Sequence, residues 1–177
     1  MQGAVLLTNG GSVLPLDPTK ATSIAVLGPN GGGCPADPTM GCPARANMVG
    51  GYSPYSAEGS NGAVSVPTIE DAVRSAFPSA AVTYLAGASI NTTTPNWPAI
   101  SAAAAAAAAS DVVILVLGDS ACVGGGFGQC TCGEGADRTD LELPGTQMAL
   151  LKVRGGITAT SEVGAAYFSN NSKMLNL

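Results

Sequence analysis

The chain has 177 residues, of which 46% are hydrophobic and 11% are charged, and its formal net charge is -5. This composition is too apolar for a disordered chain, and its few Lys and Arg residues are spread singly, which argues against a nucleic-acid partner. The alanine run at 102–109 is too short and too weakly hydrophobic to cross a bilayer, so we also expect no membrane segment.

The five cysteines are an odd number, which leaves at least one without an intramolecular partner. Cys34 and Cys42 flank a proline-rich loop, where a disulfide is expected if the protein meets an oxidising environment. Zinc is the alternative, but histidine is absent and the Cys130-x-Cys132 spacing has no matching second pair. We therefore expect no metal and no cofactor. We recognise no secretion-signal pattern in the first residues, which leaves open a signal upstream if the chain is a fragment, and the sequence does not fix the compartment.

The first predicted element is a buried strand at Ser23–Leu27, a short run rich in β-branched residues. A loop dense in Gly and Pro follows, from Gly28 to about Asn61, and we expect it to lack regular structure. Its glycine-rich start could suggest a nucleotide-binding turn. Pro35, Pro38 and Pro43 argue against that interpretation, because they forbid the helix whose amino terminus would hold the phosphate.

The next two elements are a helix and a strand. Proline is tolerated in a first helical turn, so Pro67 predicts a helix start, and Glu70 suits the positive end of that helix. Ile69, Val73 and Phe77 recur at helical spacing and predict an apolar stripe that packs on a sheet. Val82–Leu85 is the second predicted strand.

A second helix is predicted from Asn96 through Ser110, where the alanine run favours close packing against a sheet. The aliphatic run Asp111–Gly118 follows immediately and is typical of a strand buried on both faces. Leu143-Pro144-Gly145 then leads into a third helix, predicted over Thr146–Val153.

This alternation of strands and helices predicts an α/β fold, a layered parallel sheet flanked by helices. In such sheets the functional groups collect in loops that leave the carboxyl ends of strands. The two long loops, Gly28–Asn61 and Gly118–Leu143, both begin at that end of a strand. We therefore expect them to lie on the same edge of the sheet.

The second of these loops concentrates negative charge, since half of the twelve acidic residues fall between Asp111 and Glu142. Glu134 stands between Gly133 and Gly135, on backbone that can move. That setting suits a general acid that must reach a substrate held by another part of the protein.

The same loop resembles a segment of family 3 glycoside hydrolases, the β-glucosidases and β-xylosidases, that holds their acid/base glutamate. Similar segments occur in family order at 24–30, 50–53 and 109–118, and the resemblance spans Ala4 to Val153. The shared motif reads Gly133-Glu134-Gly135-x-Asp137-Arg138-x-x-Leu141-x-Leu143-Pro144-Gly145.

The resemblance implies the flavodoxin-like sandwich of the family's carboxy-terminal domain, and it assigns the acid/base role to Glu134. Asp137 and Arg138 are implied to shape the loop around it. Tyr52, an aromatic residue in the other long loop, is our candidate for a contact with the substrate. Family members are retaining enzymes whose nucleophile is an aspartate on an amino-terminal barrel domain, and no such barrel lies within this chain.

We therefore expect a family 3 carboxy-terminal domain at residues 4–153, followed by an unmatched, disordered tail at 154–177 that leaves the sheet incomplete with an unpaired edge. The predicted function belongs to carbohydrate metabolism: hydrolysis of a β-linked glucoside or xyloside, as one lobe of a retaining exo-β-glycosidase that is inactive without its barrel. The alternatives are a non-catalytic carbohydrate-binding or regulatory module, and a truncated product with no stable fold.

Overall fold

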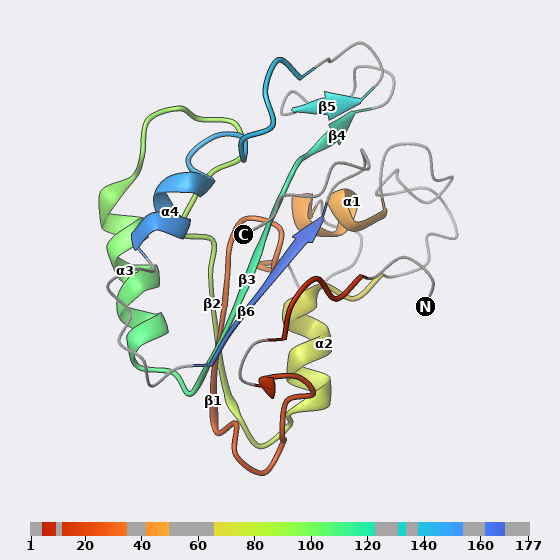
Figure 1. Cartoon of the computed structure of the whole chain (residues 1–177), viewed down its shortest axis with the longest axis vertical. Coiled ribbons are helices and arrows are strands. Elements are labelled where there is room, and N and C mark those ends of the chain that lie inside the picture. The colour runs from red at the N-terminus through yellow and green to blue at the C-terminus, as the bar shows by residue number, and fades with distance from the viewer. Residues whose placement is uncertain are drawn as a thin grey trace.

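Four parallel strands form one sheet, in the order β2-β1-β3-β6 (Figure 1). The computed structural model describes residues 5–9, 12–34, 42–49, 66–122, 131–133, 138–153 and 162–168. The sheet consists of β1 (Ser23–Leu27), β2 (Ala81–Leu85), β3 (Val112–Gly118) and β6 (Glu162–Phe168). Because all four strands run the same way, their carboxyl ends share one edge of the sheet.

Helices connect these strands, and a short strand pair follows β3. None of the helices in the described ranges is both long and apolar enough to span a membrane. The helices are α1 (Pro43–Val49), α2 (Ile69–Ala76), α3 (Trp97–Ala108) and α4 (Gln147–Val153), and the strand pair consists of β4 (Ala121–Cys122) and β5 (Cys132–Gly133).

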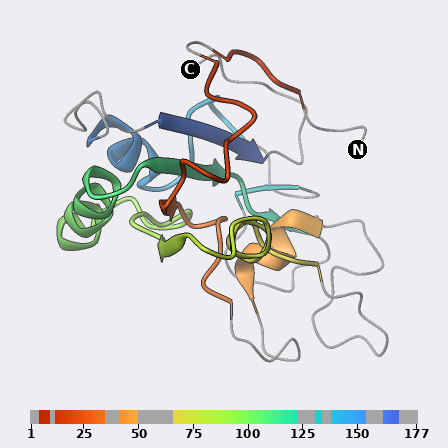
Figure 2. The same ribbon diagram turned by 90° about the horizontal axis from the view of Figure 1, so that it is seen from below.

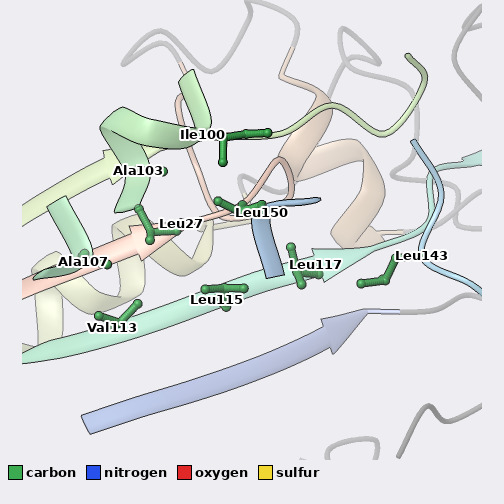
Figure 3. Packing of buried hydrophobic residues seen from close by; sticks show 10 residues of the cluster. Leu27, Ile100, Ala103, Ala107, Val113, Leu115, Leu117, Leu143 and Leu150 are labelled. Carbon is green, nitrogen blue, oxygen red and sulfur yellow. The ribbon is translucent and has the colours of Figure 1, made fainter. Parts of the chain in front are cut away.

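Alternate residues of the central strands face opposite layers of helix, as the period of two in a strand requires. On the face covered by α3 and α4, Leu27 and Leu115 pack with Ile100 and Leu150, all nearly inaccessible to solvent (Figure 3). On the other face, the remaining residues of β1 and β3 pack against Val73 of α2. Figure 1 shows α3 and α4 on one side of the strands and α2 on the other. The layered α/β prediction is confirmed.

The start of α3 follows the predicted proline signal, whereas Pro67 precedes the N-cap of α2 and does not lie in its first turn. Side-chain caps that were not predicted from the sequence begin both helices. Thr68 precedes α2, and its hydroxyl accepts from the Asp71 amide while the Asp71 carboxylate accepts from the Thr68 amide. The Asn96 side chain caps α3 in a similar way. Within α3, Ala103 and Ala107 are fully buried against the sheet, so the alanine run does provide close packing.

Helix α1 was not predicted, because the whole loop after β1 was expected to lack regular structure. The prediction was wrong at Pro43–Val49. Pro43 is the first residue of this helix, where a missing backbone N–H breaks no hydrogen bond and the fixed φ suits the first turn. Proline here starts a helix, although a proline inside a helix would interrupt it.

Strand β6 lies in the tail that we expected to be disordered, and the structure differs from that expectation at residues 162–168. All seven residues of β6 pair in parallel with β3, from Val112 with Glu162 to Gly118 with Phe168. Figure 2 shows β6 lying alongside β3. The edge of β3 that we expected to stay exposed therefore has its backbone groups paired, which removes the cost of leaving them open.

Tyr84 on β2 packs against the glycine-rich turn after β1, and its hydroxyl donates to the carbonyl of Gly28 at 3.3 Å. A side chain at Gly33, where φ is +75°, would meet the Tyr84 ring. Burial, followed by the nearby charge of Glu70, raises the pKa of Tyr84 to about 12. Since burial favours the neutral phenol, the stability that Tyr84 adds is complete below its ordinary pKa of about 10 and is lost as the pH rises from there through 12.

We therefore expect Tyr84→Phe to lower the free energy of unfolding by about 1 kcal/mol at neutral pH, through the lost hydrogen bond. The difference in free energy of unfolding between wild type and variant should shrink as the pH rises above 10, because only the wild type carries this titrating group. Urea unfolding of both proteins at neutral and alkaline pH measures this difference. A difference that stays constant across this range would contradict the assignment.

Candidate functional site

The two long loops meet at the carboxyl edge of the sheet, as predicted. Asn30 follows β1 and is fully buried, and its side-chain amide reaches the backbone carbonyl of Asp119, which follows β3, at 3.5 Å. In Figure 1, β4 and β5 lie beyond the same end of β3, on the side of the sheet where α1 lies. This edge is therefore where side chains from both loops can act together.

Helix α1 joins the two loops through one side chain. Asn47 donates to the Asn30 side chain at 2.7 Å and accepts from the Ser120 hydroxyl at 3.0 Å. A disulfide links Cys34 to Cys42, the residue just before α1, with Cα atoms 5.2 Å apart. This is the pair that the sequence suggested, and the bond ties the start of α1 back to the turn after β1.

Arg138 is the centre of the charged part of this edge. It donates to the carboxylate of Asp119 at 2.5 Å, to that of Asp140 at 2.8 Å, and to the backbone carbonyl of Glu142. Burial opposes its charge, but the hydrogen bonds and charges of Asp119 and Asp140 outweigh burial and raise the pKa of Arg138 above its ordinary value. Arg138 is thus a permanently charged group that holds three points of the loop.

Asp119 receives a second contact from the other side of the loop. The Thr131 hydroxyl donates to the same carboxylate oxygen, at 3.2 Å, and accepts from the Ser120 amide at 2.9 Å. The side chain of Asp119 is only 6% exposed, compared with 59% for Asp140. The ion pair between Asp119 and Arg138 is therefore largely shielded from solvent. The ion pair between Arg138 and Asp140 is more exposed, as is usual for ion pairs at a protein surface.

Cys132 lies beside this pair, and its thiol is buried. Burial and the negative charge of Asp119 raise the pKa of the Cys132 thiol, against the opposing charge of Arg138. Because only the thiolate is a strong nucleophile or metal ligand, this shift disfavours the reactive form of Cys132.

The base of the loop is closed by Gln147, the first residue of α4, which is fully buried. Its side-chain oxygen accepts from the Gly118 amide at 2.9 Å, and its nitrogen donates to the carbonyls of Gly118 and Pro144 at 2.8 and 2.9 Å. One side chain thus joins the end of β3, where the loop leaves, to the residues where it returns.

Of the residues predicted for the site, Arg138 lies within the described structure. Glu134, Asp137 and Tyr52 lie outside the described residues. The described residues that flank Glu134, Gly133 in β5 and Arg138, both belong to the loop at the carboxyl edge.

Sequence reasoning placed Asp119 and Thr131 in this loop but did not include them, or Gln147, among the predicted site residues. Asp119 carried a usable signal, because it comes directly after the aliphatic run of β3, where functional groups of parallel sheets collect. Thr131 and Gln147 carried none, since their roles depend on contacts across the fold.

The sequence matches the family described as "Glycosyl hydrolase family 3 C-terminal domain" over residues 4–155. It is 32% identical over 153 residues to a β-xylosidase of Formosa agariphila. The matching region covers 84% of this chain and 18% of that enzyme. The chain therefore spans about a fifth of the length of this relative.

Solved structures share the fold at lower identity. A β-glucosidase involved in saponin metabolism from intestinal bacteria superposes with a TM-score of 0.67 at 21% identity, covering 92% of this chain and 22% of its own. The β-glucosidase of Bifidobacterium adolescentis gives a TM-score of 0.58 at 22% identity, covering 91% of this chain and 19% of its own. The solved structures share the fold, and the family match over residues 4–155 shows that the chain belongs to the glycoside hydrolase family 3 C-terminal domain family.

Proposed function

We propose that this chain is the proton-donating lobe of a retaining β-glycosidase, with Glu134 as the acid/base residue. The proposal is supported by the family match over residues 4–155, which includes the Glu134 segment, together with the hydrogen bonds that fasten the residues on both sides of that segment at the carboxyl end of β3. The Asp119 carboxylate accepts hydrogen bonds from Thr131, which precedes Glu134 in the chain, and from Arg138, which follows it. Such a segment suits a carboxyl group that must meet a substrate at a fixed place.

The proposed chemistry needs two carboxyl groups. Glu134 gives its proton to the departing glycosidic oxygen while a second carboxylate, about 5 Å away, attacks the anomeric carbon and forms a glycosyl ester. Glu134, now a carboxylate, takes a proton from water, and the resulting hydroxide opens the ester with retention of configuration. The second carboxylate belongs to the barrel that the resemblance implies, so this chain alone should not turn over substrate.

The substrate class follows from the relatives, which are named as a β-xylosidase and β-glucosidases. We infer a β-linked xyloside or glucoside, with Tyr52 as a stacking surface for the sugar and with Asp137 and Arg138 shaping the loop. Stacking on an aromatic ring buries the apolar face of a sugar and leaves its hydroxyls free for hydrogen bonds.

The test is complementation. The purified chain is mixed with, or fused behind, the part of the Formosa agariphila β-xylosidase that precedes the matching segment. Release of the phenol from an aryl β-xyloside or β-glucoside is then measured. We expect no turnover from either piece alone and turnover from the combination. Absence of turnover, together with sugar binding in calorimetry that survives Glu134→Gln, would instead favour a non-catalytic carbohydrate-binding module.

A further inference from the structure

The carboxylate of Asp119 is the point at which both ends of the Glu134 segment meet. Thr131 and Arg138 contact the same oxygen, Oδ1, from opposite ends of residues 132–137. Asp119 itself follows β3, a central strand of the sheet, and the residue as a whole is buried, with 8% of its surface exposed. The contact is therefore anchored at the end of an inner strand of the sheet.

The segment needs such an anchor because its own sequence cannot fix it. Gly133 and Gly135 flank Glu134, and glycine loses more conformational freedom on ordering than any other residue. Gln147 closes the loop only at its base, between Gly118 and Pro144. Without a second tie, the free segment would run from Asp119 to Leu143, and longer free segments sample more conformations.

Backbone hydrogen bonds support the same tie on the Thr131 side. The amides of Thr131 and Cys132 both donate to the carbonyl of Ser120, at 2.8 and 3.3 Å. The Thr131 hydroxyl accepts from the Ser120 amide in return. On the other side, Arg138 also holds the Glu142 carbonyl and the Asp140 carboxylate, so Asp119 connects two locally organised pieces.

We infer that Asp119 is a positioning residue for the acid/base step: it fastens both ends of the segment that carries Glu134 to the carboxyl end of β3. The inference rests on the proposed function of Glu134. Asp119 acts through Thr131 and Arg138 and does not itself exchange a proton with the substrate.

The first test measures the tie directly in the isolated chain. Asp119→Ala should speed hydrogen exchange at the amides of Thr131 and Cys132 by about tenfold or more, because their local opening no longer breaks the Asp119 contacts. Exchange in β1 should stay unchanged. Asp119→Asn keeps an accepting oxygen and should give a smaller change. Unchanged exchange at Thr131 and Cys132 in the Ala variant would overturn the inference.

The second test uses the complemented enzyme and two substrates of different leaving group. An alkyl glycoside needs a proton from the acid, whereas a 2,4-dinitrophenyl glycoside departs as a stable anion without one. Asp119→Ala should lower kcat/KM for the alkyl glycoside by about ten- to hundredfold more than for the dinitrophenyl glycoside, as expected for a misplaced catalytic group. Asp119→Asn should recover part of that loss.

Asp111 offers a matched control at the other end of β3. Its carboxylate also joins distant backbone, since it accepts from the amides of Thr22 and Ser23. Asp111→Ala should leave the ratio between the two substrates unchanged even if the protein is less stable. An equal loss on both substrates in Asp119→Ala would mean that Asp119 has a structural role only.

The outcomes separate the two proposals. If Glu134→Gln shows no dependence on the leaving group, the proposed function fails, and hydrogen exchange still decides whether Asp119 fastens the segment. If Glu134→Gln shows the dependence and Asp119→Ala does not, only the positioning role fails.

Discussion

Glu134→Gln should lower kcat/KM of the complemented enzyme for an alkyl β-glycoside by about 10²- to 10⁴-fold, the usual contribution of a general acid. Kcat/KM for a 2,4-dinitrophenyl glycoside should change far less, because that leaving group departs without a proton. Glutamine keeps the size of the side chain and its ability to form hydrogen bonds, but it has no acidic proton to give. Steady-state rates on the two substrates, at the same pH, measure the difference.

A second carboxyl group in the same loop provides the control. Glu142 is exposed, and its described contacts come from its backbone, which accepts from Arg138 and donates to Asp140. Glu142→Gln should therefore leave both rates within about twofold of wild type, as is usual for surface changes. A similar loss in both variants would show that the loop responds to net charge and that Glu134 has no special role.

Gln147→Ala should lower the free energy of unfolding by about 2–4 kcal/mol, since it leaves buried backbone groups without partners. The Gly118 amide and the carbonyls of Gly118 and Pro144 all lose their hydrogen bonds to this side chain. Gln147 is also fully buried, so truncation opens a cavity in addition. Urea unfolding followed by circular dichroism measures the change.

Lys152 is the matched control for this experiment, because it is an exposed residue of the same helix. Lys152→Ala should change the free energy of unfolding by less than about 0.5 kcal/mol. A loss below about 1 kcal/mol for Gln147→Ala would mean that water replaces the missing amide, and that the base of the loop does not depend on this residue.

The strands and most helices were predictable because their signals are local. Aliphatic runs at Ser23–Leu27 and in β3 mark buried strands, while the helical spacing of Ile69, Val73 and Phe77 and the alanine run mark helices. Helix α1 escaped prediction because the prolines and glycines around it are typical of loops. Strand β6 escaped because the Ser- and Asn-rich residues around Glu162–Phe168 hide a short run suited to a strand.

The site was predictable only in part, and for a different reason. The motif identified Arg138 and the acid/base candidate because both lie within one continuous stretch of sequence. The partners of Arg138 come from the fold: Asp119 lies nineteen positions earlier and reaches it only once β3 places it at the carboxyl edge. Asn47 likewise meets Ser120 only because α1 forms. Contacts of this kind depend on the tertiary structure and leave no local pattern.

Azide rescue of Glu134→Ala in the complemented enzyme tests the central claim most directly. Removal of the acid/base should leave a glycosyl ester that water opens slowly, and azide, an anion that needs no base, should attack its anomeric carbon and release the enzyme carboxylate. The account predicts that azide raises turnover of a 2,4-dinitrophenyl glycoside and that the product is a glycosyl azide of retained β configuration. Wild-type activity without azide, or turnover that azide does not change, would contradict it.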